Sequence, residues 1–207
     1  MKHTIDEIHI DMKEVKLLAS LHSMVTDLKN ILVTCKSALN MTDSIEDQAC
    51  IDAIGTAGLI KYMRCFHSGK RSSLSIDDLS SFTEEERKAH QYFKALRDKH
   101  VAHSVSSYEQ CQVKGSLAFI NGARQPFTQL LPASQRVMFS KNNVWAIQQL
   151  VIMVLDIVNE KITNEEQRVL KILNGLPERE IMNFKKYVKP EIEIGIQAIT
   201  NSRKQKA

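Results

Sequence analysis

The chain has 207 residues, of which 43% are hydrophobic and 25% are charged, which are the proportions of a water-soluble globular protein with one substantial core. Aromatic residues make up only 6%, which argues against a surface that binds nucleic acid by stacking bases on aromatic rings. The formal net charge of +4 permits a nucleic-acid or phosphate partner but does not require one.

Three features of the sequence indicate the compartment in which the protein resides. Residues 1–14 alternate charged with apolar side chains and contain no hydrophobic segment of a signal peptide. The most apolar stretch, residues 144–158, is too short to span a bilayer and contains Gln148, Gln149 and Asp156. Of the 4 cysteines, three fall within apolar helical patterns and none forms a CxxC pair, so we expect buried thiols in a reducing compartment. The sequence therefore predicts a cytoplasmic protein with no membrane partner.

Two helices are predicted in the first third of the chain. Apolar residues at helical spacing predict a long helix over residues 5–39, whose buried face shifts by one residue along its length. A short break over residues 40–43 follows it. Ser44 and Asp47 then form an N-terminal capping signal for a second helix, which extends to about Phe66.

Small residues in the second helix favour close packing. No strand precedes Gly55, Ala57 and Gly58 and no GK[ST] pattern follows them, so we expect another helix to approach here and not a phosphate loop. Residues 67–82 have the composition of a loop. Lys70 and Arg71 in this loop either contact a polyanion or are simply solvated, and the solvated connector is the favoured interpretation.

Residues 83–108 contain the one helix whose burial pattern is interrupted by polar side chains. A capping box of Thr83 and Glu86 starts this helix. Its buried stripe has apolar residues at i, i+4 and i+7, namely Ala89, Phe93 and Leu96. The same spacing places His100 and His103 at the next two stripe positions. Polar residues that break a buried stripe often mark a functional or strained site.

Three interpretations of these two histidines remain open. They can be core histidines that donate to backbone carbonyls, with Arg97 paired to Asp98 or Glu86 at the surface. They can be metal ligands together with His90, but no carboxylate has matching helical spacing, so we predict no metal site. The third interpretation is a catalytic site that also uses Arg97.

Residues 105–139 have no helical period and predict a β-hairpin inserted between helices. Cys111–Val113 and Leu117–Ile120 are predicted to be short strands, and they are followed by Asn121 and Gly122, the pair most typical of a two-residue hairpin turn. Pro126 and Pro132 are expected to keep the remainder irregular or at a sheet edge. The insertion is a dimerisation arm, a lid or a substrate-guiding element, and the sequence leaves these alternatives open.

Three further helices are predicted after the hairpin. The first, over residues 141–161 with Ser140 as its cap, is apolar almost all round and should be the most buried of the fold. A capping box begins a shorter helix over residues 163–174, and Pro177 suits the first turn of a last helix that extends to Val188.

These elements predict an all-α fold, a helical bundle of four to six helices with a small β-hairpin insertion. Residues 1–161 are expected to form the bundle, with residues 105–139 as its insertion. Residues 162–207 are expected to form a C-terminal helical extension that ends in a basic tail.

The run from Leu96 to His103, LRDKHVAH, resembles the signature of the HEPN superfamily. That signature is an Arg, a polar residue that is most often Asn, a few further residues and a His, on a helix of a small all-α bundle. Here it would consist of Arg97, Asp98 and His103, with five residues between the Arg and the His. The phrase RDKHVAH is most similar to abortive-infection and toxin-type members, although Asp98 replaces the usual Asn and His100 is additional.

The resemblance implies a metal-independent endoribonuclease without a cofactor, acting in phage defence or in a toxin–antitoxin system. A His with a near-neutral pKa can exchange protons with the 2′-hydroxyl or the leaving 5′-oxygen, and an Arg can stabilise the charged transition state. Arg97 and His103 would be catalytic, with Asp98 orienting one of them and His100 in support. The cations expected to bind the RNA backbone are Lys70, Arg71 and Lys99.

The spacing of the signature also bears on assembly. On an ideal helix, Arg97 and His103 lie roughly 120° apart around the axis and about 9 Å apart along it. Two copies would form a composite site more easily than one, so we expect a homodimer whose motif helices face each other, with an antitoxin or other regulatory protein as a further partner. The alternative function is a non-catalytic helical interaction module that docks a partner through the hairpin and the C-terminal helices.

Overall fold

The structure is a computed structural model that describes residues 7–67, 72–101, 109–116, 118–124, 129–136 and 138–188. The chain divides into two compact units, Lys16–Arg168 and the residues before and after it. The described residues form five α-helices and three antiparallel pairs of strands, which confirms an all-α bundle with a small β insertion. None of the described helices is long and apolar enough to cross a membrane.

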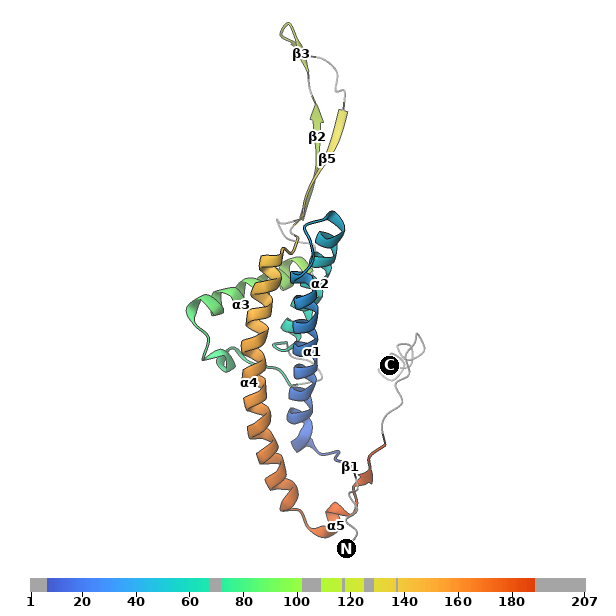
Figure 1. The fold of residues 1–207 in the computed structure, drawn as a ribbon, viewed down its shortest axis with the longest axis vertical. Helices are drawn as coiled ribbons and strands as arrows, with labels where there is room; N and C mark the ends of the chain where they lie inside the picture. Colours follow the sequence, from blue (N-terminus) through green and yellow to red (C-terminus); the bar gives the residue numbers. More distant parts are fainter. Residues whose placement is uncertain are drawn as a thin grey trace. The chain divides into compact units, whose positions relative to one another are not determined.

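The larger unit is built on four α-helices and a strand ribbon. Its helices are α1 (Lys16–Leu39), α2 (Ile45–Arg64), α3 (Glu84–Leu96) and most of α4 (Lys141–Asn174). Single short turns of other helix types are η2 (Ile76–Leu79) and η3 (Arg97–Val101). Helices α1, α2 and the first part of α4 lie side by side, and α3 lies at their flank (Figure 1).

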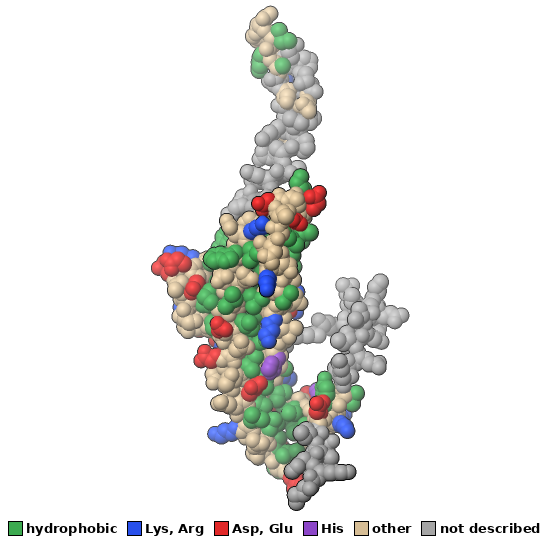
Figure 2. All heavy atoms as spheres, in the orientation of Figure 1, with side chains coloured by type: hydrophobic (Ala, Val, Ile, Leu, Met, Phe, Trp, Pro, Cys, Tyr) green, Lys and Arg blue, Asp and Glu red, His purple; other side chains and the backbone are tan. Residues whose placement is uncertain are grey.

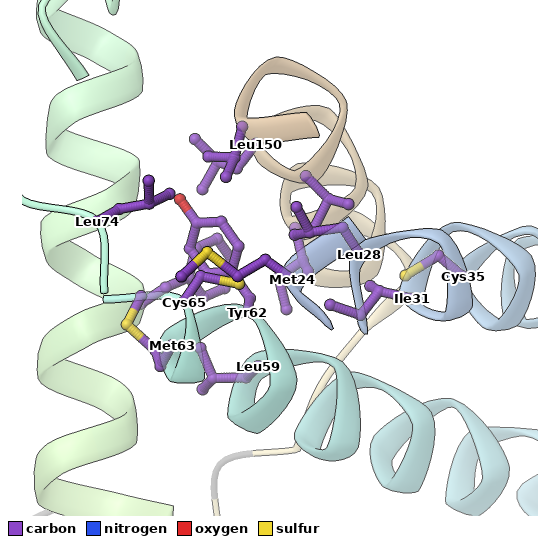
Figure 3. Close-up of a cluster of buried hydrophobic side chains, with 14 of the residues drawn as sticks. Met24, Leu28, Ile31, Cys35, Leu59, Tyr62, Met63, Cys65, Leu74 and Leu150 are labelled. Carbon is purple, nitrogen blue, oxygen red and sulfur yellow. The ribbon is translucent and has the colours of Figure 1, made fainter. Parts of the chain in front are cut away.

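The core lies between these helices and contains few polar groups. Figure 3 shows Met24 and Leu28 of α1 and Leu150 of α4 gathered around the ring of Tyr62 of α2. Each fully buried side chain of this size stabilises the fold by roughly 1.5–3 kcal/mol relative to exposure. Burial along the whole of α1 and α2 explains why helices of this length are stable.

The first helix begins later than predicted. Helix α1 starts at Lys16, and the residues before it form β1 (Ile8–His9) and the 3₁₀ turn η1 (Lys13–Val15). Strand β1 pairs with β6 (Lys185–Lys186) of the same smaller unit. The one-residue shift between the two apolar stripes therefore marks the boundary between β1, η1 and α1. Ile8, which belongs to the first stripe, is 40% exposed.

Helix α4 is one continuous helix where two were predicted. Ser140 caps it, since the Asn143 N–H donates to the Ser140 hydroxyl over 3.4 Å and the Asn143 side chain accepts the Ser140 N–H over 2.9 Å. No helix begins at Thr163, whose hydroxyl donates within the helix to the Asn159 carbonyl over 3.2 Å. The helix ends at Asn174, as predicted. The boundary expected after residue 161, between the bundle and the C-terminal extension, falls inside this helix.

The last predicted helix is much shorter than expected. Helix α5 covers only Glu178–Ile181 and follows Pro177, as predicted. The chain then forms strand β6, because its pairing with β1 satisfies the backbone groups in place of a further helical turn.

Two small residues of α2 permit close packing. A Cβ at Gly58 would meet Ile31 of α1 at 3.5 Å, so a neighbouring helix does approach there. At Gly55 the neighbour is instead Phe139, whose side-chain atoms would lie 2.6 Å from an added Cβ. The Phe139 N–H donates to the buried Asp52 carboxylate over 2.8 Å, which fixes the entry of α4 against α2.

Some apolar residues lie at the surface instead of in the core (Figure 2). Trp145 and Ile152 of α4 are 56% and 42% exposed. Contrary to the prediction, this helix is therefore not buried on every side. Cys35 and Cys65 are buried thiols that form no disulfide with another described residue, but Cys50 is exposed.

The predicted hairpin is present and is longer than expected. Its tip pairs β3 (Phe119–Ile120) with β4 (Ala123–Arg124), and its stem pairs β2 (Glu109–Ser116) with β5 (Gln129–Arg136). Asn121 and Gly122 have positive φ angles of 49° and 81°, as a type I′ turn requires. Pro132 pairs opposite Val113 within β5, because both strands of a two-stranded ribbon are edges that tolerate a missing N–H.

Candidate functional site

Helix α3 begins at the predicted capping box. The Thr83 N–H donates to the Glu86 carboxylate over 2.7 Å, and the Glu86 N–H donates to the Thr83 hydroxyl over 3.3 Å. Its buried face consists of Phe93, Leu96 and His90. The cap and this apolar face fix the position of α3 against the bundle, and with it the residues that follow Leu96.

The helix changes type at the signature. The five residues Arg97–Val101 form a π-helical turn, which is defined by a hydrogen bond to the carbonyl five residues back instead of four. The N–H of Arg97 itself still donates to the Phe93 and Lys94 carbonyls. The α-helical spacing used to extend the buried stripe to His100 and His103 thus does not hold through this turn, and the side chains of both residues lie outside the described part of the chain. Single π-helical turns are rare and occur frequently at functional sites.

Arg97 lies where the π-helical turn meets the end of α2. Its Nη1 atom is 2.8 Å from Nε2 of His67 and 2.9 Å from Oδ1 of Asp98. The side chain keeps 33% of its surface exposed. Its Nη2 and Nε atoms make no hydrogen bond to other residues in the part of the chain that the structure describes. Among the described residues, His67 and Asp98 thus hold Nη1, and no partner is found for Nη2 and Nε, which can bind an anion.

The ring of His67 is held in one protonation pattern by its two neighbours. Its Nδ1 atom is 3.1 Å from the Met63 carbonyl oxygen, which only accepts, so Nδ1 carries the proton. Its Nε2 atom faces the Arg97 guanidinium, which only donates, so Nε2 presents its lone pair. His67 is therefore the neutral Nδ1–H tautomer in this arrangement.

Asp98 completes the cluster as a carboxylate. The hydrogen bond from Arg97 lowers its pKa below the ordinary value, and the positive charges of Arg97 and Lys94 act in the same direction. The cluster of Arg97, Asp98 and His67, which we call the Arg97 cluster, so combines a fixed cation, a fixed anion and a neutral imidazole. The predicted Arg97–Asp98 ion pair is confirmed at 2.9 Å.

His90 is buried in the interface between α2 and α3 and has a structural role. It is 3% exposed, its Nδ1 atom is 2.9 Å from the Tyr62 hydroxyl, and its ring packs edge-on against Phe66 at 4.7 Å. Burial, with a smaller effect of Lys94, lowers its pKa to about 4. A buried neutral imidazole that bonds a tyrosine is a core histidine. The sequence offered this interpretation for His100 and His103 and considered His90 only as a possible metal ligand.

The remaining predicted residues fall in different places. Lys99 is exposed in the turn after Asp98. The backbone of His100 belongs to the π-helical turn, but its side chain lies outside the described residues, as do His103, Lys70 and Arg71 altogether. The structure therefore brings together Arg97 and Asp98 of the signature.

Sequence reasoning missed His67. It lies 30 residues before Arg97, at the end of α2, and no local spacing relates the two. The only signal was a polar aromatic residue at a helix end close to the cations of the following loop.

Other sites in the structure do not involve these residues. A pocket of about 350 Å³ in the larger unit is lined by residues of α1, η2 and α4, with the Lys161–Asp78 ion pair at 2.6 Å on its wall. Within the described ranges, no three or more His, Cys, Asp or Glu side chains are arranged to hold a metal ion.

The Arg97 cluster can bind and polarise an oxyanion and offers an imidazole lone pair beside it. That pairing suits transfer of a proton at a phosphate ester. Comparison of the chain with protein-family models, with curated proteins and with solved structures found no match.

Proposed function

We propose that the protein is a metal-independent endoribonuclease of HEPN type, in which Arg97 binds the scissile phosphate. The observation that carries the proposal is the guanidinium of Arg97, whose Nη1 is fixed by His67 and Asp98 while Nη2 and Nε have no partner among the residues that the structure describes. A fixed charge directed at a phosphate stabilises the transition state without reorganisation during the reaction. The planar fork of Arg also matches two phosphate oxygens better than Lys would.

The other roles follow the HEPN resemblance. His103 transfers the proton, Asp98 orients Arg97, and His100 supports the turn. Support for the role of Asp98 comes from its 2.9 Å hydrogen bond to Arg97 and from its lowered pKa, which keeps it anionic. The cations that bind the RNA backbone are Lys70, Arg71 and the exposed Lys99.

The assembly and setting are part of the same proposal. The protein acts as a cytoplasmic homodimer whose motif helices face each other, in phage defence or a toxin–antitoxin system, with an antitoxin or other regulatory protein as partner.

The proposal is tested by RNA cleavage in the presence of a chelator. Wild type should cut a single-stranded RNA, and Arg97→Ala and His103→Ala should each lower kcat by about 100-fold or more. Arg179→Ala is the matched control, because Arg179 is exposed in α5 of the smaller unit and should leave the rate unchanged. Intact RNA with wild type, or equal rates in all variants, would refute the nuclease.

The alternative is a non-catalytic interaction module, and the hairpin tip favours it. Phe119 and Ile120 are 63% and 59% exposed, and adjacent exposed apolar side chains can form a surface that binds a protein. If RNA remains intact with and without divalent metal, we expect these two side chains to carry partner binding, and Phe119→Ser with Ile120→Ser to abolish it in a pull-down with the purified partner.

A further inference from the structure

We propose that His67 is the general base of the site, taking the proton from the 2′-hydroxyl that attacks the phosphate bound by Arg97. This inference rests on the proposed function and assigns a residue outside the HEPN signature.

The first argument is the tautomer of His67. A general base needs a lone pair directed toward the substrate, and the Nδ1–H bond to the Met63 carbonyl leaves that lone pair on Nε2. Nε2 points at Arg97, with 2.8 Å between the two nitrogen atoms. The base is therefore directed at the phosphate-binding side chain, and 35% of the His67 side chain is exposed for a substrate to reach.

The second argument is the distance between the two groups. The attacking 2′-hydroxyl and the scissile phosphate belong to adjacent positions of one ribose, so the base and the phosphate-binding cation must be neighbours. When a phosphate engages Nη2 and Nε of Arg97, the neighbouring 2′-hydroxyl can replace the guanidinium as the hydrogen-bond donor to Nε2 of His67. Within the described residues, His67 is the one histidine in contact with Arg97.

The third argument is the charge that forms during the reaction. Protonated His67 is an imidazolium, and Oδ1 of Asp98 lies 3.7 Å from its Nε2 atom. Among the described residues, the charged groups that face His67 are Arg97 and Asp98, and Lys94 acts on the Asp98 carboxylate. A bound phosphate offsets the charge of Arg97, so the carboxylate then stabilises the new cation.

The step balances without a metal or a redox partner. The 2′-O–H bond breaks and its proton passes to Nε2 of His67, while the 2′-oxygen forms a bond to phosphorus. The bond from phosphorus to the 5′-oxygen breaks, and that oxygen takes one proton from the acid of the proposed site. The products are a 2′,3′-cyclic phosphate and a 5′-hydroxyl, and solvent returns both residues to their starting protonation states. The substrate must therefore be RNA with a free 2′-hydroxyl.

The experiment separates proton transfer from the positioning of Arg97. His67→Ala removes both, whereas His67→Gln keeps an amide oxygen that can accept from Arg97 but cannot take up a proton. We expect both variants to lower kcat by about 100-fold to 10,000-fold with little change in KM. Imidazole in the buffer should restore part of the activity of His67→Ala only. His22→Ala is the matched control, because His22 is also partly exposed and paired with a carboxylate, at 3.6 Å from Glu166.

Two results overturn the inference in distinguishable ways. If wild type and His67→Gln cut RNA equally fast while Arg97→Ala is inactive, the nuclease stands and His67 is not its base. If wild type itself leaves RNA intact with chelator present, the proposed function fails and the role of His67 fails with it. Nitrogen NMR of labelled His67 then shows whether the Nδ1–H tautomer is present, which tests the geometry of the Arg97 cluster by itself.

Discussion

At the scale of single residues, the hydrogen bond between His90 and Tyr62 fixes how α2 and α3 pack and so brings the residues of the Arg97 cluster together. The two side chains meet in the buried interface of α2 and α3 at 2.9 Å. His67 follows five residues after Tyr62 and Arg97 follows seven residues after His90, so this bond sets the register in which the two later residues meet. A buried polar pair of this kind specifies one packing arrangement, because a slipped register leaves a polar group without a partner.

The burial of His90 predicts that stability depends on pH. Its pKa is lowered to about 4 in the folded protein, compared with the ordinary value of 6.5. Between these two values the unfolded chain binds a proton that the native protein does not, so the free energy of unfolding decreases as the pH falls. Lowering the pH from 7 to 5 should therefore destabilise the protein by about 2 kcal/mol through this residue, measured by urea unfolding.

The control is His90→Asn, in which the amide can still bond the Tyr62 hydroxyl but does not titrate. Its free energy of unfolding should change less between pH 7 and pH 5 than that of wild type, whatever its absolute stability. An equal change in both proteins would show that His90 does not hold its neutral form in the folded state.

At the scale of elements, the entry of α4 depends on the contact between Gly55 and Phe139. An added Cβ at Gly55 would lie 2.6 Å from Phe139, so Gly55→Ala should destabilise the protein by about 1–3 kcal/mol through overpacking. Gly58→Ala is the matched control in the same helix. Its Cβ would meet Ile31 at an ordinary 3.5 Å, and the better helix propensity of Ala should add up to about 1 kcal/mol of stability. Equal midpoints of thermal unfolding for the two variants would contradict the close contact.

Local signals in the sequence predicted the element ends that local chemistry determines. The capping box of Thr83 and Glu86, the cap at Ser44 and the Asn121-Gly122 turn are all confirmed. Each depends on residues within a few positions of one another, so spacing alone identifies them.

The features that the sequence did not predict depend on contacts between distant residues. Thr163 carries a capping signal, but its neighbours pack as one helix, and the hydroxyl bonds Asn159 instead. The π-helical turn at Arg97 has no periodic signature, and His67 reaches Arg97 only because α2 and α3 pack together. Tertiary packing decides such cases over local preference.

At the scale of the whole molecule, the proposed homodimer predicts complementation between inactive variants. If each site takes Arg97 from one protomer and His103 from its partner, a mixture of Arg97→Ala and His103→Ala chains contains heterodimers with one intact site. Half of the dimers in an equal mixture are such heterodimers, so activity should recover to about a quarter of the wild-type rate. The same mixture should remain inactive if both residues of a site come from one chain, or if the protein is a monomer by light scattering.

The most direct test of the central claim compares wild-type cleavage of an RNA oligonucleotide with cleavage of DNA of the same sequence, both in the presence of chelator. Because the proposed chemistry needs a 2′-hydroxyl and no metal, RNA should be cut to fragments with 2′,3′-cyclic phosphate and 5′-hydroxyl ends, identified by mass spectrometry. The DNA should remain intact. Uncut RNA, cleavage of both strands, or fragments with 3′-hydroxyl ends would each contradict a nuclease built around Arg97.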